Sequence, residues 1–227
     1  MEPGGNAMNK QVLIIGAGGI GSLLAEHITR AFAFSGLSEN HVLNLTMMDG
    51  DVVESRNLPH QQFGHDNLSH PKVSIVRNRV MAIGSSSQSP IKVDAIVEDF
   101  SGETDLSKYE LVIIAVDREE PRRIVHANAN QWLDLRARGD GFVMWSHLDD
   151  LQILNSLPKL LEGKSASCQL DGAIETGNIQ FGFALAAAHG AQWVVQWLRG
   201  GSPPSGKMYS IHMGELPMPE PSQGLVE

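Results

Sequence analysis

The sequence QVLIIGAGGIGS, at residues 11–22, indicates the fold class of this chain. Residues 12–15 form a continuous β-branched and aliphatic run, which is typical of a strand buried on both faces of a parallel sheet. Four glycines follow this run, at positions Gly16, Gly18, Gly19 and Gly21. Glycines let the backbone approach a phosphate, and a helix that begins here presents free N–H groups and the positive end of its dipole. The stretch therefore predicts a strand, a phosphate-binding turn and a helix over residues 19–34.

The rest of the chain alternates between apolar runs and segments with a helical pattern. We expect further strands at residues 42–48, 91–97, 111–116, 142–146 and 208–213, and further helices at residues 71–83, 121–138 and 175–198. We expect a long ordered loop at residues 50–70, a short one at 84–87, and a loop with a short helix at 149–173. This alternation predicts an α/β fold with a doubly wound, mostly parallel sheet and helices on both faces. We expect one domain at residues 11–216, between a flexible lead-in at 1–10 and a proline-rich tail at 217–227.

The composition favours a globular protein of the cytoplasm. Hydrophobic residues make up 42% of the 227 residues, which is enough for a sizeable core. The net charge of −9 argues against nucleic acid or an anionic membrane surface as the main partner. The single cysteine excludes an intramolecular disulfide and a cysteine-based zinc site within this chain. Residues 1–10 do not resemble a signal peptide, and the longest apolar stretch, residues 179–198, contains polar side chains and is typical of a buried helix.

The glycine run fits two kinds of nucleotide. Its spacing satisfies the dinucleotide fingerprint G-x-G-x-x-G, which is a weak signal when it stands alone. A dinucleotide fold expects an acid at the end of the second strand, about 20 residues beyond the glycines. Asp49 lies at a predicted strand end but farther along the chain, so ribose binding by Asp49 agrees with either ligand. The segment that follows Asp49 separates ATP from NAD.

That segment makes the chain resemble the ThiF/MoeB/HesA adenylyltransferases, the family of ubiquitin-activating enzymes. The family motif is GxGGxGS, a DxD strand end, NLxRQ, a lysine on the next helix, and D-N-x-x-x-R after a strand. Matching positions here are Gly16, Gly18, Gly19, Gly21, Ser22, Asp49, Asp51, Asn57, Leu58, Gln61, Lys72, Asp117 and Arg122. They occur in the same order over residues 11–125, and their combination is far more specific than any one of them. The likeness is strongest to small stand-alone bacterial ThiF-type proteins.

The resemblance implies a function and a set of roles. It implies a two-fold homodimer that uses ATP and Mg²⁺ to adenylate the C-terminal carboxylate of a small ubiquitin-like protein. The glycine run and Asp51 would belong to the nucleotide site, and Asp49 would hold the ribose hydroxyls. Asn57, Gln61 and Lys72 would contact ribose or phosphates. Asp117 would hold Mg²⁺, a hard cation that prefers carboxylate and phosphate oxygens.

The sequence departs from the family pattern at two positions, which keeps two other functions open. His60 replaces the arginine of NLxRQ, and an imidazole carries a full charge only part of the time near neutral pH. Arg118 replaces the asparagine that follows the metal-binding aspartate, and Asp117 could simply cap a helix that begins near Pro121. One alternative is an NAD-dependent oxidoreductase, and the other is a non-catalytic relative that binds a nucleotide or a partner. Together with Gln61, His60 is nevertheless a candidate catalytic residue.

Cys168 is a third candidate catalytic residue. In part of this family a cysteine beyond the adenylation site receives the acyl group as a thioester, and cysteine is a good nucleophile once its pKa is lowered. Cys168 lies in the polar segment KSASCQ, where Lys164 could favour the thiolate. The alternative role is that of a small buried side chain or a bystander thiol.

Overall fold

The computed structural model describes residues 7–87, 89–150, 152 and 168–218. Within these ranges, eight strands form one sheet in the order β3-β2-β1-β4-β5-β6-β7-β8. The strands are β1 (Met8–Ile15), β2 (His41–Met48), β3 (Ile91–Ile96), β4 (Leu111–Ile114), β5 (Trp132–Arg138), β6 (Gly141–Ser146), β7 (Lys207–Ser210) and β8 (Gly214–Leu216). The five strands from β3 to β5 pair in parallel, and β6, β7 and β8 continue the sheet in antiparallel pairing. The predicted doubly wound, mostly parallel sheet is thus confirmed.

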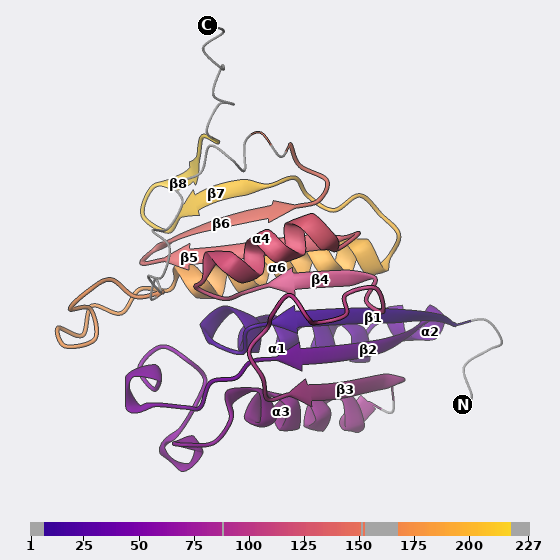
Figure 1. Cartoon of the computed structure of the whole chain (residues 1–227), viewed down its shortest axis with the longest axis horizontal. Coiled ribbons are helices and arrows are strands. Elements are labelled where there is room, and N and C mark those ends of the chain that lie inside the picture. The colour runs from indigo at the N-terminus through magenta and orange to yellow at the C-terminus, as the bar shows by residue number, and fades with distance from the viewer. Residues whose placement is uncertain (1–6, 88, 151, 153–167, 219–227) are drawn as a thin grey trace, which may run out of the picture.

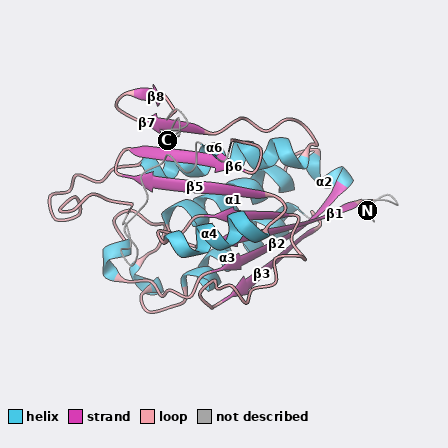
Figure 2. Ribbon diagram, turned by 45° about the horizontal axis from the view of Figure 1, so that its top comes forward, coloured by secondary structure: helices cyan, strands magenta, loops and turns pink. Residues whose placement is uncertain are grey.

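The α-helices cover both faces of this sheet. They are α1 (Gly19–Ala33), α2 (Leu37–Asn40), α3 (Lys72–Ser87), α4 (Glu119–Asn128) and α6 (Gly182–Leu198). In Figures 1 and 2, α4 lies on one face, and α1, α3 and α6 lie on the other. Val12 and Ile14 of β1 pack with the three-helix side, whereas Leu13 and Ile15 pack with the α4 side. All four are at most 1% exposed, which explains why the apolar run of β1 is continuous.

The order in which successive strands are added to the sheet reverses between β1 and β4. From β1 the chain passes through α1 to β2 on one side, whereas β4 pairs with β1 on the other side. In open α/β sheets the crevice outside the carboxyl ends of the strands at such a switch point is where ligands bind. The glycine loop after β1 and the segment after β4 both lie at this edge.

Residues 121–138 do not form one helix, and that prediction is wrong. The helix α4 ends at Asn128, and residues 132–138 form β5 between β4 and β6. Leu133 and Leu135 are fully buried on one side of the sheet, and Trp132 is buried on the other. Burial on both sides is what a central strand requires, and it outweighs the good local helix propensity of the leucines.

Two other boundaries also differ from the prediction. Residues 84–87 were expected to be a loop but form the last turn of α3, where the hydroxyls of Ser86 and Ser87 donate to the carbonyls of Ile83 and Gly84. The helix expected from residue 175 begins instead at Gly182. Its start is delayed because the Gln169 side chain binds both the N–H and the carbonyl of Gln180, which a helix would otherwise use.

The ends of the described chain complete the sheet. β1 begins at Met8, where residues 8–10 pair with the start of β2, so the expected lead-in at 1–10 overlaps a strand. The single strand expected at 208–213 is a hairpin of β7 and β8. Most of the loop with a short helix expected at 149–173 lies outside the described residues. Within the described ranges, none of the helices combines the length and the apolar character needed to cross a membrane.

Candidate functional site

The glycine loop links β1 to α1 in a conformation that requires glycine. Gly16 has a φ of +100°, and a Cβ atom there would lie 2.6 Å from the Ala115 carbonyl oxygen. A Cβ atom on Gly21 would lie 1.9 Å from the Gly16 carbonyl oxygen. The loop therefore packs tightly against the end of β4 and against the first turn of α1. No side chain caps the N-terminus of α1, so its first N–H groups are free to bind an anion.

Asp49 connects the end of β2 to this loop. Its Oδ2 accepts the backbone N–H of Ala17 at 2.6 Å, and its Oδ1 accepts the N–H of Asp51 at 2.8 Å. Burial raises the pKa of Asp49, and these two hydrogen bonds and the nearby Lys72 oppose that rise. The carboxylate is half-buried, and its remaining lone pairs are available to hydroxyl donors.

The predicted loop at residues 50–70 is closed at its base and ordered by one asparagine. Val52 and Pro71 form an antiparallel bridge, which brings the two ends of the loop together. Asn57 is buried, its side chain accepts the N–H of Glu54 at 2.9 Å, and its carbonyl accepts the N–H of Gln61 at 2.8 Å. The 3-10 helices η1 (Ser55–Asn57) and η2 (His65–Asn67) lie within the loop. The loop therefore holds its polar side chains in fixed positions at the edge of the sheet.

Lys72 projects from the first turn of α3 toward the end of β2. Its Nζ lies 2.7 Å from Oδ2 of Asp51, and its side chain is only 8% exposed. The Asp51 side chain is 68% exposed, so only the lysine of this ion pair is buried. A buried ammonium group that lines the same pocket as the N-terminus of α1 suits phosphate oxygens.

Almost all of the predicted site residues line one pocket. It encloses about 440 Å³ at the carboxyl edge of the parallel strands, which falls in the range of ligand sites. The predicted residues that line it are Gly16, Gly18, Gly19, Asp49, Asp51, Asn57, His60, Gln61, Lys72, Asp117 and Cys168. Gly21 does not line the pocket and serves the packing of α1 described above. The structure thus brings the motif residues together, while their individual roles stay predictions.

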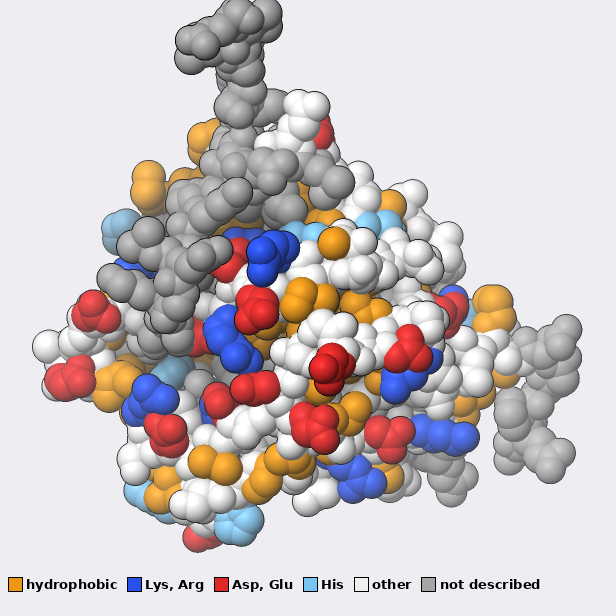
Figure 3. All heavy atoms as spheres, viewed as in Figure 1, with side chains coloured by type: hydrophobic (Ala, Val, Ile, Leu, Met, Phe, Trp, Pro, Cys, Tyr) orange, Lys and Arg blue, Asp and Glu red, His pale blue; other side chains and the backbone are white. Residues whose placement is uncertain are grey.

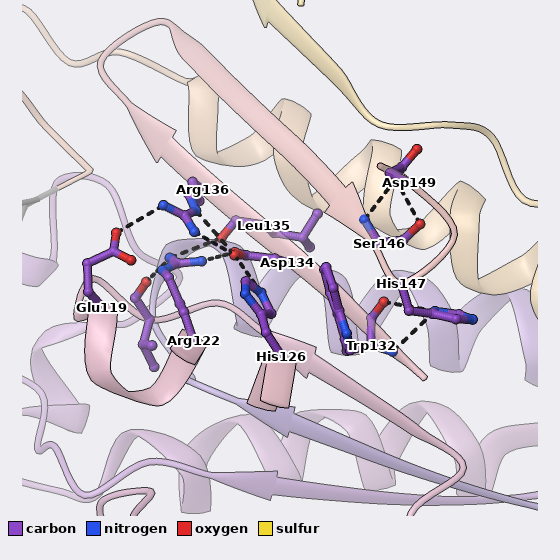
Figure 4. Close-up of polar contacts among 11 residues, drawn as sticks. Glu119, Arg122, His126, Trp132, Asp134, Leu135, Arg136, Ser146, His147 and Asp149 are labelled. Carbon is purple, nitrogen blue, oxygen red and sulfur yellow. Dashed lines mark hydrogen bonds and ion pairs between the residues drawn. The ribbon is translucent and has the colours of Figure 1, made fainter. Parts of the chain in front are cut away.

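Sequence reasoning missed a buried charge cluster at one wall of this pocket. Asp134 of β5 is 1% exposed and forms ion pairs with Arg122 of α4 and, at 2.9 Å, with Arg136. His126 lies 3.2 Å from the same carboxylate, and Glu119 holds Arg136 at 2.9 Å. Figure 4 shows these side chains arranged around Asp134. The sequence pattern favours one helix over residues 121–138, and such a helix would separate the partners that β5 brings together.

This cluster also reaches the segment that carries Asp117. Arg122 donates to the carbonyl of Val116, the residue before Asp117, and both arginines line the pocket. Burial and then Arg136 lower the pKa of Arg122 to about 9, and Glu119 and Asp117 oppose this. Burial and then the two arginines lower the pKa of His126 to about 4. Arg122 is therefore charged and His126 neutral at neutral pH.

Arg118, which stands where the family has asparagine, pairs with another acid at the pocket edge. Its guanidinium lies 3.2 Å from Asp99, and both residues line the pocket. On the face that α4 covers, the described acidic and basic side chains are interspersed (Figure 3). The wall of the pocket thus offers positive groups that are already balanced by carboxylates.

Cys168 lies in the pocket as a half-buried thiol. Burial and then the negative charge of Asp117 raise the pKa of Cys168 to about 11. The thiol form therefore predominates at neutral pH, in contrast to the lowered pKa that a nucleophile needs. Lys164, which was expected to favour the thiolate, lies outside the described residues.

The residues present fit a nucleotide with a magnesium ion. An uncapped helix N-terminus and Lys72 suit phosphates, and Asp49 suits hydroxyl donors. Among the described residues there is no group of three or more His, Cys, Asp or Glu side chains that could hold a metal ion by itself. Mg²⁺ is commonly bound by one or two carboxylates together with substrate phosphates, and Asp117 can supply such a carboxylate.

Comparison with known sequences identifies one family. The model of the ThiF family matches residues 6–221. The adenylyltransferase and sulfurtransferase MOCS3 of Arabidopsis thaliana is 32% identical over 130 residues, which are 55% of this chain and 25% of that protein. This chain therefore spans about a quarter of the length of that curated relative.

Solved structures share the fold at low sequence identity. Escherichia coli MccB in complex with MccA-N7isoASN has a TM-score of 0.63 at 18% identity, covering 94% of this chain and 66% of that chain. MccB with ATP has a TM-score of 0.59 at 18% identity, with coverage of 96% and 66%. PaaA has a TM-score of 0.61 at 17% identity, with coverage of 92% and 64%. These likenesses extend over nearly the whole of this chain and about two thirds of each neighbour.

Proposed function

Because this chain belongs to the ThiF family, we propose that it is an ATP-dependent adenylyltransferase that activates a carboxylate. One observation carries this proposal. The free N-terminus of α1, Lys72, Asp49 and Asp117 come from four separate segments and meet in a single pocket of about 440 Å³. They supply a phosphate site, a ribose acceptor and a metal-binding carboxylate together.

The proposed reaction asks little covalent chemistry of the protein. A carboxylate oxygen of the substrate attacks the α-phosphorus of ATP, and the bond from that phosphorus to the bridging oxygen breaks. The electron pair leaves with pyrophosphate, and an acyl adenylate remains. When Mg²⁺ is bound, it neutralises charge on the phosphates. The chain must therefore hold the phosphates in line and stabilise their charge.

The position of each side chain supports the role that we propose for it. Asp49 accepts the ribose hydroxyls, and Lys72 and the first turn of α1 bind phosphate oxygens. Asn57 and Gln61 lie on the ordered loop, where they can contact ribose or phosphates. Asp117 would hold Mg²⁺, and Arg122 fixes the backbone beside it through the Val116 carbonyl.

For the substrate, we propose the C-terminal carboxylate of a small ubiquitin-like protein. The similarity to an adenylyltransferase and sulfurtransferase supports an acyl adenylate as the product. Thioester transfer to Cys168 would follow adenylation and would require the thiol to lose its proton first. We also propose that the chain acts in the cytoplasm as a two-fold homodimer, as in the family that the motifs resemble.

Calorimetry with two ligands tests the proposed function. We expect ATP–Mg²⁺ to bind the wild type and to bind Asp117→Ala more weakly, while the exposed-site control Asp66→Ala binds like the wild type. Exchange of labelled pyrophosphate into ATP, with candidate small proteins added, then tests catalysis. Tight binding of NAD⁺ that is indifferent to Asp117 would overturn the proposal in favour of an oxidoreductase. Binding of neither ligand would favour a non-catalytic relative.

A further inference from the structure

His60 lies in the pocket wall, at the position where the family motif has an arginine. The arginine would be permanently charged, whereas the histidine is not. His60 follows η1 on the ordered loop, is 9% exposed and lines the same pocket as Lys72. Its ring meets the ring of Phe183 edge-on at a centroid distance of 6.3 Å. Because this histidine is nine-tenths buried and lines the proposed phosphate site, its protonation state affects phosphate binding.

The hydrogen-bond contacts of His60 indicate a neutral ring. Its Nε2 lies 3.5 Å from the amide nitrogen of Gln61, while its Nδ1 is buried without a hydrogen-bond partner. An amide N–H₂ group can only donate, so with the Gln61 amide in this orientation Nε2 is the acceptor and the single ring proton resides on Nδ1. The Oε1 atom of Gln61 is also buried without a partner. The pair therefore leaves the Nδ1–H donor of His60 and the Oε1 acceptor of Gln61 unused. Turning the Gln61 amide over would place its Oε1, in place of its nitrogen, next to Nε2 of His60.

The charges around the pocket agree with a neutral ring. Burial and then the positive charge of Lys72 lower the pKa of His60. On the other sides, α6 contributes the uncharged Phe183, and the neighbouring side chain Gln61 is also uncharged. The other charged or titratable groups that line the pocket are Asp49, Asp51, Arg56, Asp99, Asp117, Arg118, Arg122, Arg136 and Cys168. An anionic ligand beside Lys72 would offset the cation that disfavours a second positive charge.

We propose that His60 takes up one proton when the phosphates of ATP enter the pocket. The proton comes from solvent and binds at Nε2, so the neutral imidazole becomes an imidazolium. The Gln61 amide turns over, and its unused Oε1 accepts the new Nε2–H. The phosphates thereby face a positive charge on His60 that is absent before they bind. This inference rests on the proposed function, because it requires that ATP binds here.

Proton uptake has a consequence for affinity. Between the pKa of His60 in the free protein and its higher pKa in the complex, affinity for ATP falls about tenfold for each unit of pH rise. An arginine at this position would bind phosphates without that dependence, since it stays charged throughout. His60 would thus make nucleotide binding strongest at mildly acidic pH.

Calorimetry in buffers with different heats of ionisation counts the protons directly. The probe is the non-hydrolysable analogue AMPCPP with Mg²⁺ at neutral pH, in MOPS, HEPES and Tris. We expect the wild type to take up about one proton per ligand. His60→Gln and His60→Arg should bind without uptake. His65→Gln removes an exposed histidine of the same loop and should behave like the wild type.

A second measurement remains informative if a His60 variant does not fold. Proton and nitrogen NMR of the histidine rings in the wild type should show one ring that is neutral without ligand and charged with it. Binding of AMPCPP without proton uptake, or with uptake that persists in His60→Gln, would overturn this inference and leave the proposed function standing. No binding by the wild type across the range where histidine titrates would overturn both.

Discussion

The carboxylate of Asp49 ties the end of β2 to the glycine loop, because its Oδ2 accepts the backbone N–H of Ala17 at 2.6 Å. Its other oxygen accepts the N–H of Asp51 at 2.8 Å, so both oxygens fix backbone before any ligand arrives. Asp49 therefore shapes the turn that is proposed to hold phosphates, in addition to its proposed contact with ribose.

Replacing this carboxylate by an amide tests whether Asp49 both fixes the backbone of the loop and contributes to ligand binding. Asp49→Asn has one oxygen, so one of the two backbone N–H groups would face an N–H₂ group. We expect unfolding to become easier by about 1–2 kcal/mol and ATP–Mg²⁺ binding to weaken. Urea denaturation and calorimetry measure the two effects. The exposed-site control Asp66→Asn should change neither, and an Asp49→Asn protein of full stability would show that the loop does not depend on the second oxygen.

Lys72→Met should separate ligand binding from folding. Methionine keeps much of the buried aliphatic stem of Lys72. The partner Asp51 is 68% exposed, so water solvates its carboxylate when the counter-charge is removed. We expect less than about 1 kcal/mol of lost stability but about a hundredfold weaker ATP binding. Calorimetry measures the binding, and the exposed-site variant Lys108→Met is the control. A large loss of stability with unchanged binding would contradict the phosphate role of Lys72.

The residues of the pocket could be predicted because most of them follow strands. Parallel strands place their carboxyl ends at one edge, so Gly16, Asp49 and Asp117 had to meet once the strands were assigned. The ion pair of Lys72 with Asp51 was not predictable in the same way. It depends on the bridge between Val52 and Pro71, which no local sequence pattern predicts.

The prediction failed where burial outweighed local preference. Residues 132–138 carry leucine and arginine, which favour helices, yet they form a strand because the sheet buries both of their faces. That error hid Asp134, whose partners Arg122 and His126 lie on the preceding helix. Ion pairs between separate elements leave no periodic trace in a sequence.

Removing the charge of Asp134 should destabilise the fold strongly. Asp134→Asn leaves Arg122 buried without its direct counter-charge, for which we expect a loss of about 3–5 kcal/mol in a urea titration. The double variant Arg122→Met with Asp134→Leu replaces the pair by apolar groups and should recover much of that loss. A stable double variant would show that the charges of Arg122 and Asp134 are needed to organise the pocket more than to stabilise the fold. A loss below about 1 kcal/mol in Asp134→Asn would contradict the buried pairing.

His126 should make the protein less stable in acid. Its pKa falls from the usual 6.5 to about 4 in the folded state, so the unfolded chain binds the proton more readily between these values. The stability associated with neutral His126 is therefore present above pH 6.5 and is lost as the pH falls to about 4, by about 3 kcal/mol. His126→Gln should flatten this part of the profile of unfolding free energy against pH. The exposed-site control His27→Gln should keep the wild-type slope.

Cys168 should react slowly with alkylating reagents. The thiolate is the reactive form, and a pKa of about 11 in place of 9.0 lowers its population at neutral pH about a hundredfold. Because this is the single cysteine of the chain, mass spectrometry of iodoacetamide labelling reports on it alone. We expect labelling about a hundredfold slower than that of a free thiol with the ordinary pKa, rising with pH toward about 11. Fast labelling at neutral pH would instead reveal a thiolate ready to receive an acyl group, and would make Cys168→Ala the decisive variant for thioester formation.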